Sequence, residues 1–171
     1  VRNHSGTHLL HAALRRVLGP QAMQKGSLVA PGRLRFDFTH DSPLDTAQID
    51  AIEDLANEWI QANVPANLRE MAYRDAIAAG AVAIFEEKYG ERVRVISFDP
   101  YSTELCGGTH ARATGDIGLL KILSDSGIAS GVRRIEAATG LAALAIFRDQ
   151  ERSLERVAAA LRTSVAELPE R

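Results

Sequence analysis

Two motifs about one hundred residues apart carry four metal-binding side chains, and they constrain the fold more than any other feature of the chain. His4 and His8 lie near its start, and Cys106 and His110 lie in the run Cys-Gly-Gly-Thr-His. Residues four apart share one face of a helix, so His4 and His8 can grip one ion from one side. Thiolate and imidazole groups together suit zinc. The sequence therefore predicts a domain in which two distant segments meet at one zinc ion.

The ligand set has one open alternative. His11 lies on the same predicted helix face as His4 and His8 and could replace one of them. The spacing of four in both pairs favours His4 and His8, which leaves His11 as a neighbour of the site or a core residue. Gly107 and Gly108 lie between Cys106 and His110 and would allow a tight turn that brings these two side chains together.

The motifs and the composition exclude several classes of protein. A zinc protease needs a glutamate directly after its first histidine, and Ser5 stands there. Zinc-finger ligands lie close together, unlike these two pairs. A net charge of −2 gives no overall basic field, so RNA contacts would have to come from local patches. No ATP-binding signature is present, and no apolar run approaches the ~20 residues of a membrane span.

The same features suggest where the protein works. A single cysteine excludes an internal disulfide and fits a reducing cytoplasm. Val1 leads almost directly into the histidine pair without a signal peptide, so we expect a cytoplasmic protein without a membrane partner. Because the chain starts at Val with a motif at residue 4, it reads as a piece of a longer protein.

Predicted helices and strands interleave without a regular βαβ repeat. The first helix, capped by Asn3 or Ser5, runs to about Leu18, and Trp59 is a core residue of the second. We expect helices over 41–63 and 73–89, and strands over 26–29, 33–38, 64–73, 93–98, 117–124 and 131–138, with a turn at 126–130. This order favours an α+β fold, a two-layer sandwich with a mostly antiparallel sheet packed with helices.

The C-terminal part changes pattern from residue 141 on. Apolar side chains fall seven apart among many charges, at Phe147, Leu154, Leu161 and Leu168. Such a stripe fits a coiled coil, and it equally fits a C-terminal amphipathic helix packed on its own domain. We therefore divide the chain into a domain over 1–140 and a helix over 141–171 that could begin a coiled-coil linker, with Pro169 marking its end.

Several runs together resemble the editing domain of bacterial alanyl-tRNA synthetases, from about Val1 to Gly140. They are residues 2–11, 24–28, 35–38, 104–110 and 131–136. Threonyl-tRNA synthetases have a related domain, but their second motif usually ends in Gly-Pro-His, where this chain has Gly108-Thr109-His110. That difference favours the alanyl branch. Free-standing editing proteins of the same superfamily share both metal pairs, so the polypeptide context stays open.

The resemblance implies zinc-dependent hydrolysis of the ester that joins a wrong amino acid, mainly serine or glycine, to the 3′ end of alanine tRNA. In this reading Thr7 hydrogen-bonds the hydroxyl of a serine substrate, and Gln24 matches a position that lines the editing pocket. The rest of the synthetase would be a partner, and the C-terminal region would allow a dimer.

Basic residues are the candidates for tRNA contact. Arg133 and Arg134 are adjacent on a predicted strand, so only one can face the site while the other meets solvent or phosphate. Lys121 is a third candidate for phosphate, and further local patches are offered by Arg33, Arg35 and Arg112.

The number of protein ligands leaves open whether the zinc site is catalytic or structural. Four protein ligands usually form a closed structural site, whereas catalytic zinc keeps one position open. Either one ligand exchanges with water or substrate, or the chain is a non-catalytic tRNA-binding or assembly module with structural zinc.

Overall fold

The computed structural model describes residues 1–83 and 89–170. These residues form two antiparallel sheets packed with helices, so the predicted α+β class is confirmed. In chain order the elements are α1 (Arg2–Leu18), β1 (Gln24–Val29), β2 (Leu34–Thr39), α2 (Thr46–Gln61), β3 (Asn67–Ala72), α3 (Tyr73–Ala78), β4 (Arg92–Phe98), β5 (Ser102–Leu105), η2 (Thr114–Ile117), β6 (Leu120–Ala129), β7 (Val132–Thr139), α4 (Leu141–Ala160) and η3 (Val165–Glu170).

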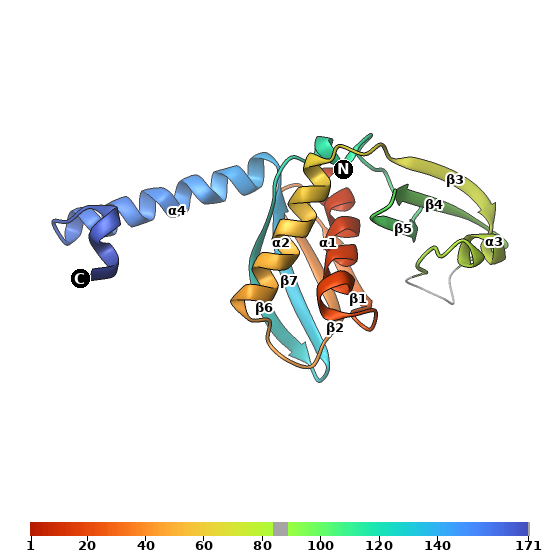
Figure 1. Cartoon of the computed structure of the whole chain (residues 1–171), viewed down its shortest axis with the longest axis horizontal. Helices are drawn as coiled ribbons and strands as arrows, with labels where there is room; N and C mark the ends of the chain where they lie inside the picture. The colour runs from red at the N-terminus through yellow and green to blue at the C-terminus, as the bar shows by residue number, and fades with distance from the viewer. Residues whose placement is uncertain (84–88, 171) are drawn as a thin grey trace.

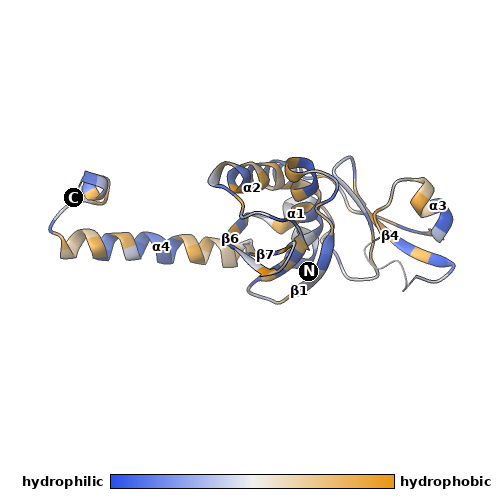
Figure 2. Ribbon diagram, turned by 90° about the horizontal axis from the view of Figure 1, so that it is seen from below, coloured by the Kyte–Doolittle hydropathy of each residue, from blue (hydrophilic) through white to orange (hydrophobic). Residues whose placement is uncertain are grey.

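The larger sheet has the order β1-β2-β7-β6, and helices α1 and α2 cover one of its faces (Figures 1 and 2). Strand β2 supplies Leu34, Phe36 and Phe38 to the core between the layers, all fully buried. Their alternate spacing turns them to one side of the sheet, where Phe36 lies opposite Ile135 of β7. The predicted strands over 26–29 and 33–38 are confirmed as β1 and β2, which pair antiparallel.

The smaller sheet has the order β3-β4-β5 and carries α3. A second, smaller core lies between them, formed by Ala76, Ala81, Val93, Val95 and Leu105. Strands β3 and β4 were predicted, but β5 was not. It pairs with β4 from Val95↔Leu105 to Phe98↔Ser102, and so places the Cys106 motif directly at the end of a strand.

Helix α1 begins differently from the prediction. Its N-cap is Val1, and no side chain caps it. Ser5 and Asn3, the predicted caps, are drawn into contacts with distant segments. The Ser5 hydroxyl accepts from the backbone N–H of Ala111 at 2.9 Å, and the Asn3 side-chain oxygen accepts from the Thr139 hydroxyl at 2.7 Å. These bonds tie the first turns of α1 to the segments that surround the metal-ligand motifs.

Two helix boundaries depart from the predicted ranges. Helix α2 begins at Thr46, not at residue 41, because Asp45 and Gln48 form a reciprocal capping box that fixes its start. Helix α3 ends at Ala78, followed by Gly80 with a φ of 83° in the left-handed region. The rest of the helix predicted over 73–89 includes residues 84–88, which lie outside the described residues. Trp59 is buried in the core, as predicted.

The hairpin of β6 and β7 is longer than predicted. Strand β6 runs to Ala129, and the turn consists of Ser130 and Gly131 alone. The small residues expected to form a turn at 126–130 are therefore largely paired with β7, from Ser126↔Arg134 to Ala129↔Val132. A φ of 68° at Gly131 allows the tight reversal.

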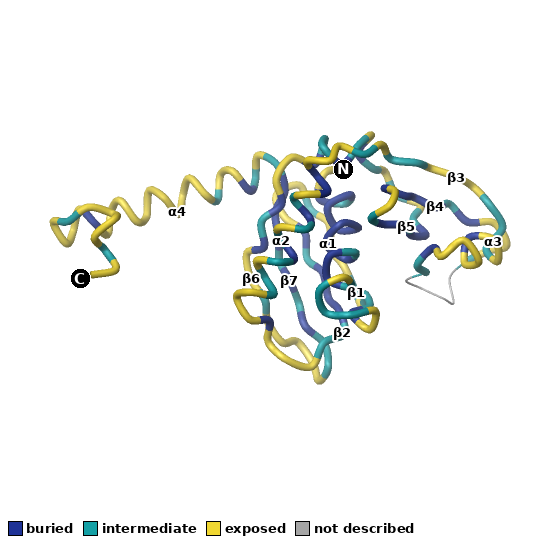
Figure 3. The backbone as a smooth tube through the Cα atoms, viewed as in Figure 1, coloured by how far each residue is buried: buried dark blue, intermediate teal, exposed yellow. Residues whose placement is uncertain are grey.

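Helix α4 extends away from the two layers, and most of it is exposed (Figures 1 and 3). The predicted C-terminal helix is present, but it ends at Ala160, and Leu168 lies in the separate segment η3. The stripe of apolar residues is therefore not continuous on one helix. Phe147 and Leu154 are 40% and 49% exposed. The coiled-coil role stays a prediction. None of the helices in the described ranges has the length and apolar content needed to span a lipid bilayer.

Candidate metal centre

The two predicted ligand pairs meet in space. His4 and His8 lie one turn apart in the first half of α1, and the loop after β5 brings Cys106 and His110 against them. Each of the four offers one ligand atom, and these atoms all lie within 4.8 Å of one another. Cys106 Sγ and His4 Nε2 are 3.4 Å apart. His11 is not one of this group.

The outer nitrogens of the three clustered histidines have partners elsewhere. His4 Nδ1 lies 3.1 Å from the Thr109 carbonyl oxygen, His8 Nδ1 lies 2.5 Å from Glu104 Oε2, and His110 Nδ1 lies 3.4 Å from Ser5 Oγ. Partners of this kind fix the ring orientation of metal-binding histidines and leave Nε2 as the donor to the metal.

The inner nitrogens fit a cation. Nε2 of His8 and of His110 are buried and have no hydrogen-bond partner among the described residues. Buried ring nitrogens without a partner are uncommon in folded proteins, and a cation would satisfy both. Three imidazoles and one thiolate form a donor set that suits zinc.

The electrostatics favour a thiolate at Cys106. Burial by itself would raise the pKa of this thiol, but the adjacent imidazoles of His110, His4 and His8 stabilise the thiolate and lower the pKa to about 3. Burial also opposes the charged form of His8, yet the charge of Glu104 raises the His8 pKa to about 10 in the metal-free protein. A cation bound by these residues would therefore displace a proton from His8.

The loop after Cys106 approaches α1 closely. A Cβ added at Gly108 would lie 2.1 Å from His4 Cε1, whereas one added at Gly107 would meet nothing within 4 Å. Neither glycine has a positive φ. A left-handed backbone therefore does not require glycine at either position, and Gly108 makes room for the His4 ring. Arg94 of β4 holds the loop by donating to the carbonyl oxygens of Gly107 and Gly108, at 2.9 and 2.8 Å.

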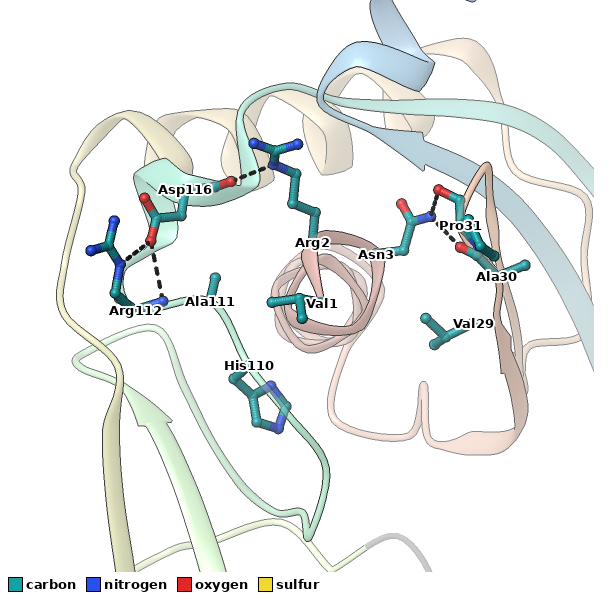
Figure 4. A pocket seen from close by; sticks show the side chains of 10 residues that line it. All are labelled: Val1, Arg2, Asn3, Val29, Ala30, Pro31, His110, Ala111, Arg112 and Asp116. Atoms are coloured by element: carbon teal, nitrogen blue, oxygen red, sulfur yellow. Dashed lines mark hydrogen bonds and ion pairs between the residues drawn. The ribbon is translucent and has the colours of Figure 1, made fainter.

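A cleft of about 740 Å³ opens beside the cluster, with His110 in its wall (Figure 4). Its rim carries two arginines, which Asp116 positions. Arg2 Nε donates to the Asp116 backbone oxygen at 2.9 Å, and Arg112 Nε donates to the Asp116 carboxylate at 3.2 Å. The remaining lining residues are Val1, Asn3, Val29, Ala30, Pro31 and Ala111.

Comparison with known proteins supports the resemblance to these synthetases. Residues 93–136, which include Cys106 and His110, match the family described as "Threonyl and Alanyl tRNA synthetase second additional domain". These residues are therefore similar to the second additional domain of these synthetases. The sequence resemblance to this family is thereby confirmed.

The relatives are alanine–tRNA ligases. The chain is 57% identical to the alanine–tRNA ligase of Myxococcus xanthus over 169 residues, which are 99% of this chain and 19% of the relative. It is 55% identical to that of Bordetella avium over 171 residues, 100% of this chain and 20% of the relative. It is 52% identical to that of Thermotoga maritima, again over 100% of this chain and 20% of the relative. The chain thus spans about a fifth of the length of these ligases.

The two pocket residues expected from the synthetase resemblance lie on neighbouring elements. Thr7 is buried on α1, one residue before His8, and its hydroxyl donates to the Asn3 carbonyl oxygen at 2.8 Å. Gln24 begins β1, and its side-chain amide donates to the Ser27 hydroxyl at 3.1 Å. Within the described ranges, neither side chain hydrogen-bonds to one of the four ligands. Their roles stay predictions.

The three cations expected to contact tRNA each have an acidic partner. Arg133 and Arg134 do point to opposite faces, and they pair with Asp125 and Asp37, each with a shortest distance of 2.7 Å. Lys121 lies 2.8 Å from a carboxylate oxygen of Glu53. Arg133 is the most enclosed, at 9% exposure. Contact with tRNA by these residues stays a prediction.

Two residues of the centre were not anticipated. Glu104 lies within hydrogen-bond distance of His8. Its position two residues before Cys106 could have indicated that it faces the metal site, because alternate residues of a strand face the same side. Arg94 holds the metal-binding loop from the neighbouring strand. No local pattern in the sequence points to Arg94, since its contact depends on the pairing of β4 with β5.

Proposed function

We propose that this chain is the proofreading part of an alanine–tRNA ligase. It hydrolyses the ester that joins a wrongly attached serine or glycine to the 3′ end of alanine tRNA. The observation that carries this proposal is the convergence of His4, His8, Cys106 and His110 beside an open cleft. The 57% identity to a segment of an alanine–tRNA ligase supports alanine tRNA as the tRNA of the substrate. The rest of such a ligase would be the chain's partner.

The metal of the proposal is Zn²⁺, held by these four residues. When bound, zinc polarises an ester carbonyl or lowers the pKa of a bound water. The protein's part is to hold the ligands. Glu104 fixes the His8 ring, and the Thr109 carbonyl fixes the His4 ring. Cys106 acts as a thiolate ligand and not as a nucleophile, because the lone pair that would attack is used for the metal.

The four ligands of the cluster differ in exposure. His8 is buried at 3% exposure, whereas His4, Cys106 and His110 are half-buried. His110 also lines the cleft, so a substrate reaches the cluster from the His110 side. We propose that a ligand on this side gives way to water or substrate, which would reconcile four protein ligands with catalysis.

The same cleft offers contacts for the end of the tRNA. Arg2 and Arg112 place two cations on its rim, suited to the phosphates of the nucleotides near the 3′ end. Thr7 does not line this cleft, but we propose that it accepts from the hydroxyl of a serine substrate, because donation to Asn3 leaves its oxygen lone pairs available. Gln24 is proposed to hold substrate or water.

Further contacts with the rest of the tRNA are proposed for Lys121, Arg133 and Arg134. Each shares its charge with a carboxylate, so a phosphate would compete with that partner. We also propose that the exposed apolar residues of α4 take part in a dimer formed through the C-terminal region. Sedimentation of the protein with and without residues 141–171 tests the dimer.

The decisive experiment combines metal content with hydrolysis of seryl-tRNA(Ala), with and without chelator. Wild type should contain about one zinc per chain and lose hydrolysis with chelator. Cys106→Ala should lose both zinc and hydrolysis. His40→Ala is the matched histidine control, because His40 packs on Phe38, away from the cluster, and this variant should keep both. Hydrolysis at the wild-type rate by a zinc-free variant contradicts the proposal.

Two other outcomes identify the alternatives. Zinc-loaded protein that binds tRNA but hydrolyses no seryl-tRNA(Ala) indicates a non-catalytic tRNA-binding or assembly module with structural zinc. A free-standing protein that edits in trans is separated from a ligase by the sequence on either side of residues 1–171, because a ligase carries an aminoacylation domain before them.

A further inference from the structure

A buried carboxylate joins one metal ligand to a histidine outside the ligand set. Glu104, at 3% exposure, is the second-to-last residue of β5 and lies between two imidazole rings of α1. Its Oε2 lies 2.5 Å from His8 Nδ1. Its Oε1 lies 2.8 Å from His11 Nδ1. Both oxygens of one carboxylate are thus bound to imidazoles one turn apart, which fixes the plane of the carboxylate.

The two histidines are the ionic partners of Glu104. Over residues 1–83 and 89–170 no Lys or Arg forms an ion pair with it. A buried carboxylate that loses one donor keeps an unsatisfied charged oxygen, which costs more than a neutral group left in the same state. The side chain would then turn toward another donor, and its hold on His8 would change. The orientation of His8 therefore depends on His11.

Packing holds His11 in turn. Its side chain is fully buried, and its ring lies 5.2 Å from that of Phe36, centroid to centroid. Its Nδ1 faces Glu104, while its ligand atoms are not among those that converge with Cys106. His11 is therefore placed to donate to Glu104, not to replace His4 or His8 as a ligand.

We propose that His11 is a positioning residue of the metal centre, which acts through Glu104 to keep Nε2 of His8 directed at the shared cation site. The inference rests on the proposed zinc site, but it does not depend on whether the protein hydrolyses mischarged tRNA. It assigns a role to a histidine that makes no direct contact with the cluster.

The test measures zinc affinity by competition with a chromophoric chelator, together with the visible spectrum of the Co²⁺-loaded protein. His11→Leu removes the donor at similar volume, and it should weaken zinc binding by about 10- to 100-fold, the usual effect of losing such a partner. His11→Asn should remain within a few-fold of wild type, because its amide can donate to Glu104 from nearly the same position. His40→Leu and His40→Asn are matched controls and should bind zinc as wild type does.

A double-mutant cycle separates positioning from packing. Glu104→Gln removes the charge and offers one acceptor oxygen for two imidazoles, so it should weaken zinc binding by itself. Adding His11→Leu to Glu104→Gln should then cost little more, because both changes act on one interaction. Additive losses, unchanged zinc affinity in His11→Leu, or equal losses in His11→Asn and His11→Leu would each overturn the inference.

One measurement needs no variant. Long-range ¹H–¹⁵N spectra of the wild-type protein should show a proton on Nδ1 of His11, with and without zinc. An unprotonated Nδ1 refutes the hydrogen bond to Glu104. If hydrolysis is absent while the order of zinc affinities holds, the proposed function fails and the inference stands. If hydrolysis is present while the order of zinc affinities does not hold, the role of His11 is rejected and the proposed function stands.

Discussion

Replacement of Gly108 by alanine tests how closely the Cys106 loop and α1 must approach. The added Cβ would lie 2.1 Å from His4 Cε1 and 2.8 Å from His4 Nδ1, where contacts under 3.0 Å essentially never occur. The His4 ring cannot simply turn away, because its Nδ1 bonds to the Thr109 carbonyl and its Nε2 lies 3.4 Å from Cys106 Sγ. Either the ring or the loop has to move.

The size of the movement sets the expected effect. To bring the Cβ to His4 Cε1 separation from 2.1 Å to an ordinary 3.4 Å, the groups have to part by about 1.3 Å. Metal–ligand distances tolerate only about 0.2 Å. One ligand is therefore lost or badly placed, and we expect zinc affinity to fall by more than about 100-fold, beyond the usual effect of losing an outer partner.

The assay is competition for zinc with a chromophoric chelator, with thermal unfolding as the check on folding. Gly107→Ala is the matched control: it makes the same chemical change one residue away, with nothing within 4 Å of the new methyl group. Neither position has a positive φ, so backbone strain does not distinguish them. Zinc binding by Gly108→Ala within twofold of wild type, or equal losses in both variants, would refute the reasoning.

Four further predictions follow from the same structure. Thr7→Val should reduce the ratio of kcat/KM for seryl- over alanyl-tRNA(Ala) about tenfold through loss of one hydrogen bond, and an unchanged ratio removes Thr7 from the pocket. In the metal-free protein, burial by itself would raise the Glu104 pKa, but the imidazoles of His8 and His11 lower this pKa to about 2, below the ordinary 4.5. Its contribution to the free energy of unfolding is therefore complete above pH 4.5 and lost as the pH falls toward 2, which acid unfolding of wild type and Glu104→Gln can measure. Arg133→Met leaves the buried Asp125 carboxylate without its ionic partner and should lower the free energy of unfolding by about 3 to 5 kcal/mol, as measured by urea denaturation. Finally, tRNA affinity should fall as salt rises; a flat salt dependence argues against phosphate contacts.

Local periodicity explains the parts of the fold that were predicted correctly. Strand β2 shows its buried face in the alternation of Leu34, Phe36 and Phe38, and α1 shows its face in the spacing of four between His4 and His8. These patterns arise from backbone geometry within a few residues, so the sequence carries them directly. The matched spacing and the ligand chemistry of the two pairs added the expectation that they meet.

The wrong predictions concern boundaries that depend on single contacts. Asn3 and Ser5 look like helix caps, but Thr139 and Ala111 draw their side chains away from the helix end. The turn expected at 126–130 is mostly strand because β7 continues to pair with it. In each case a partner distant in sequence competes with the local preference, and the tertiary contact decides.

The identity of the donor atoms was thus contained in the sequence, because cysteine and histidine side chains carry their chemistry wherever they lie. The amino-acid order alone did not determine how these donor atoms are oriented. Glu104 reaches His8 and His11 across 96 and 93 residues, and the His4 ring fits only because the distant residue 108 has no side chain. Such contacts form only after β5 has joined its sheet and α1 has packed beside it, so the folded structure decided the orientation of the metal centre.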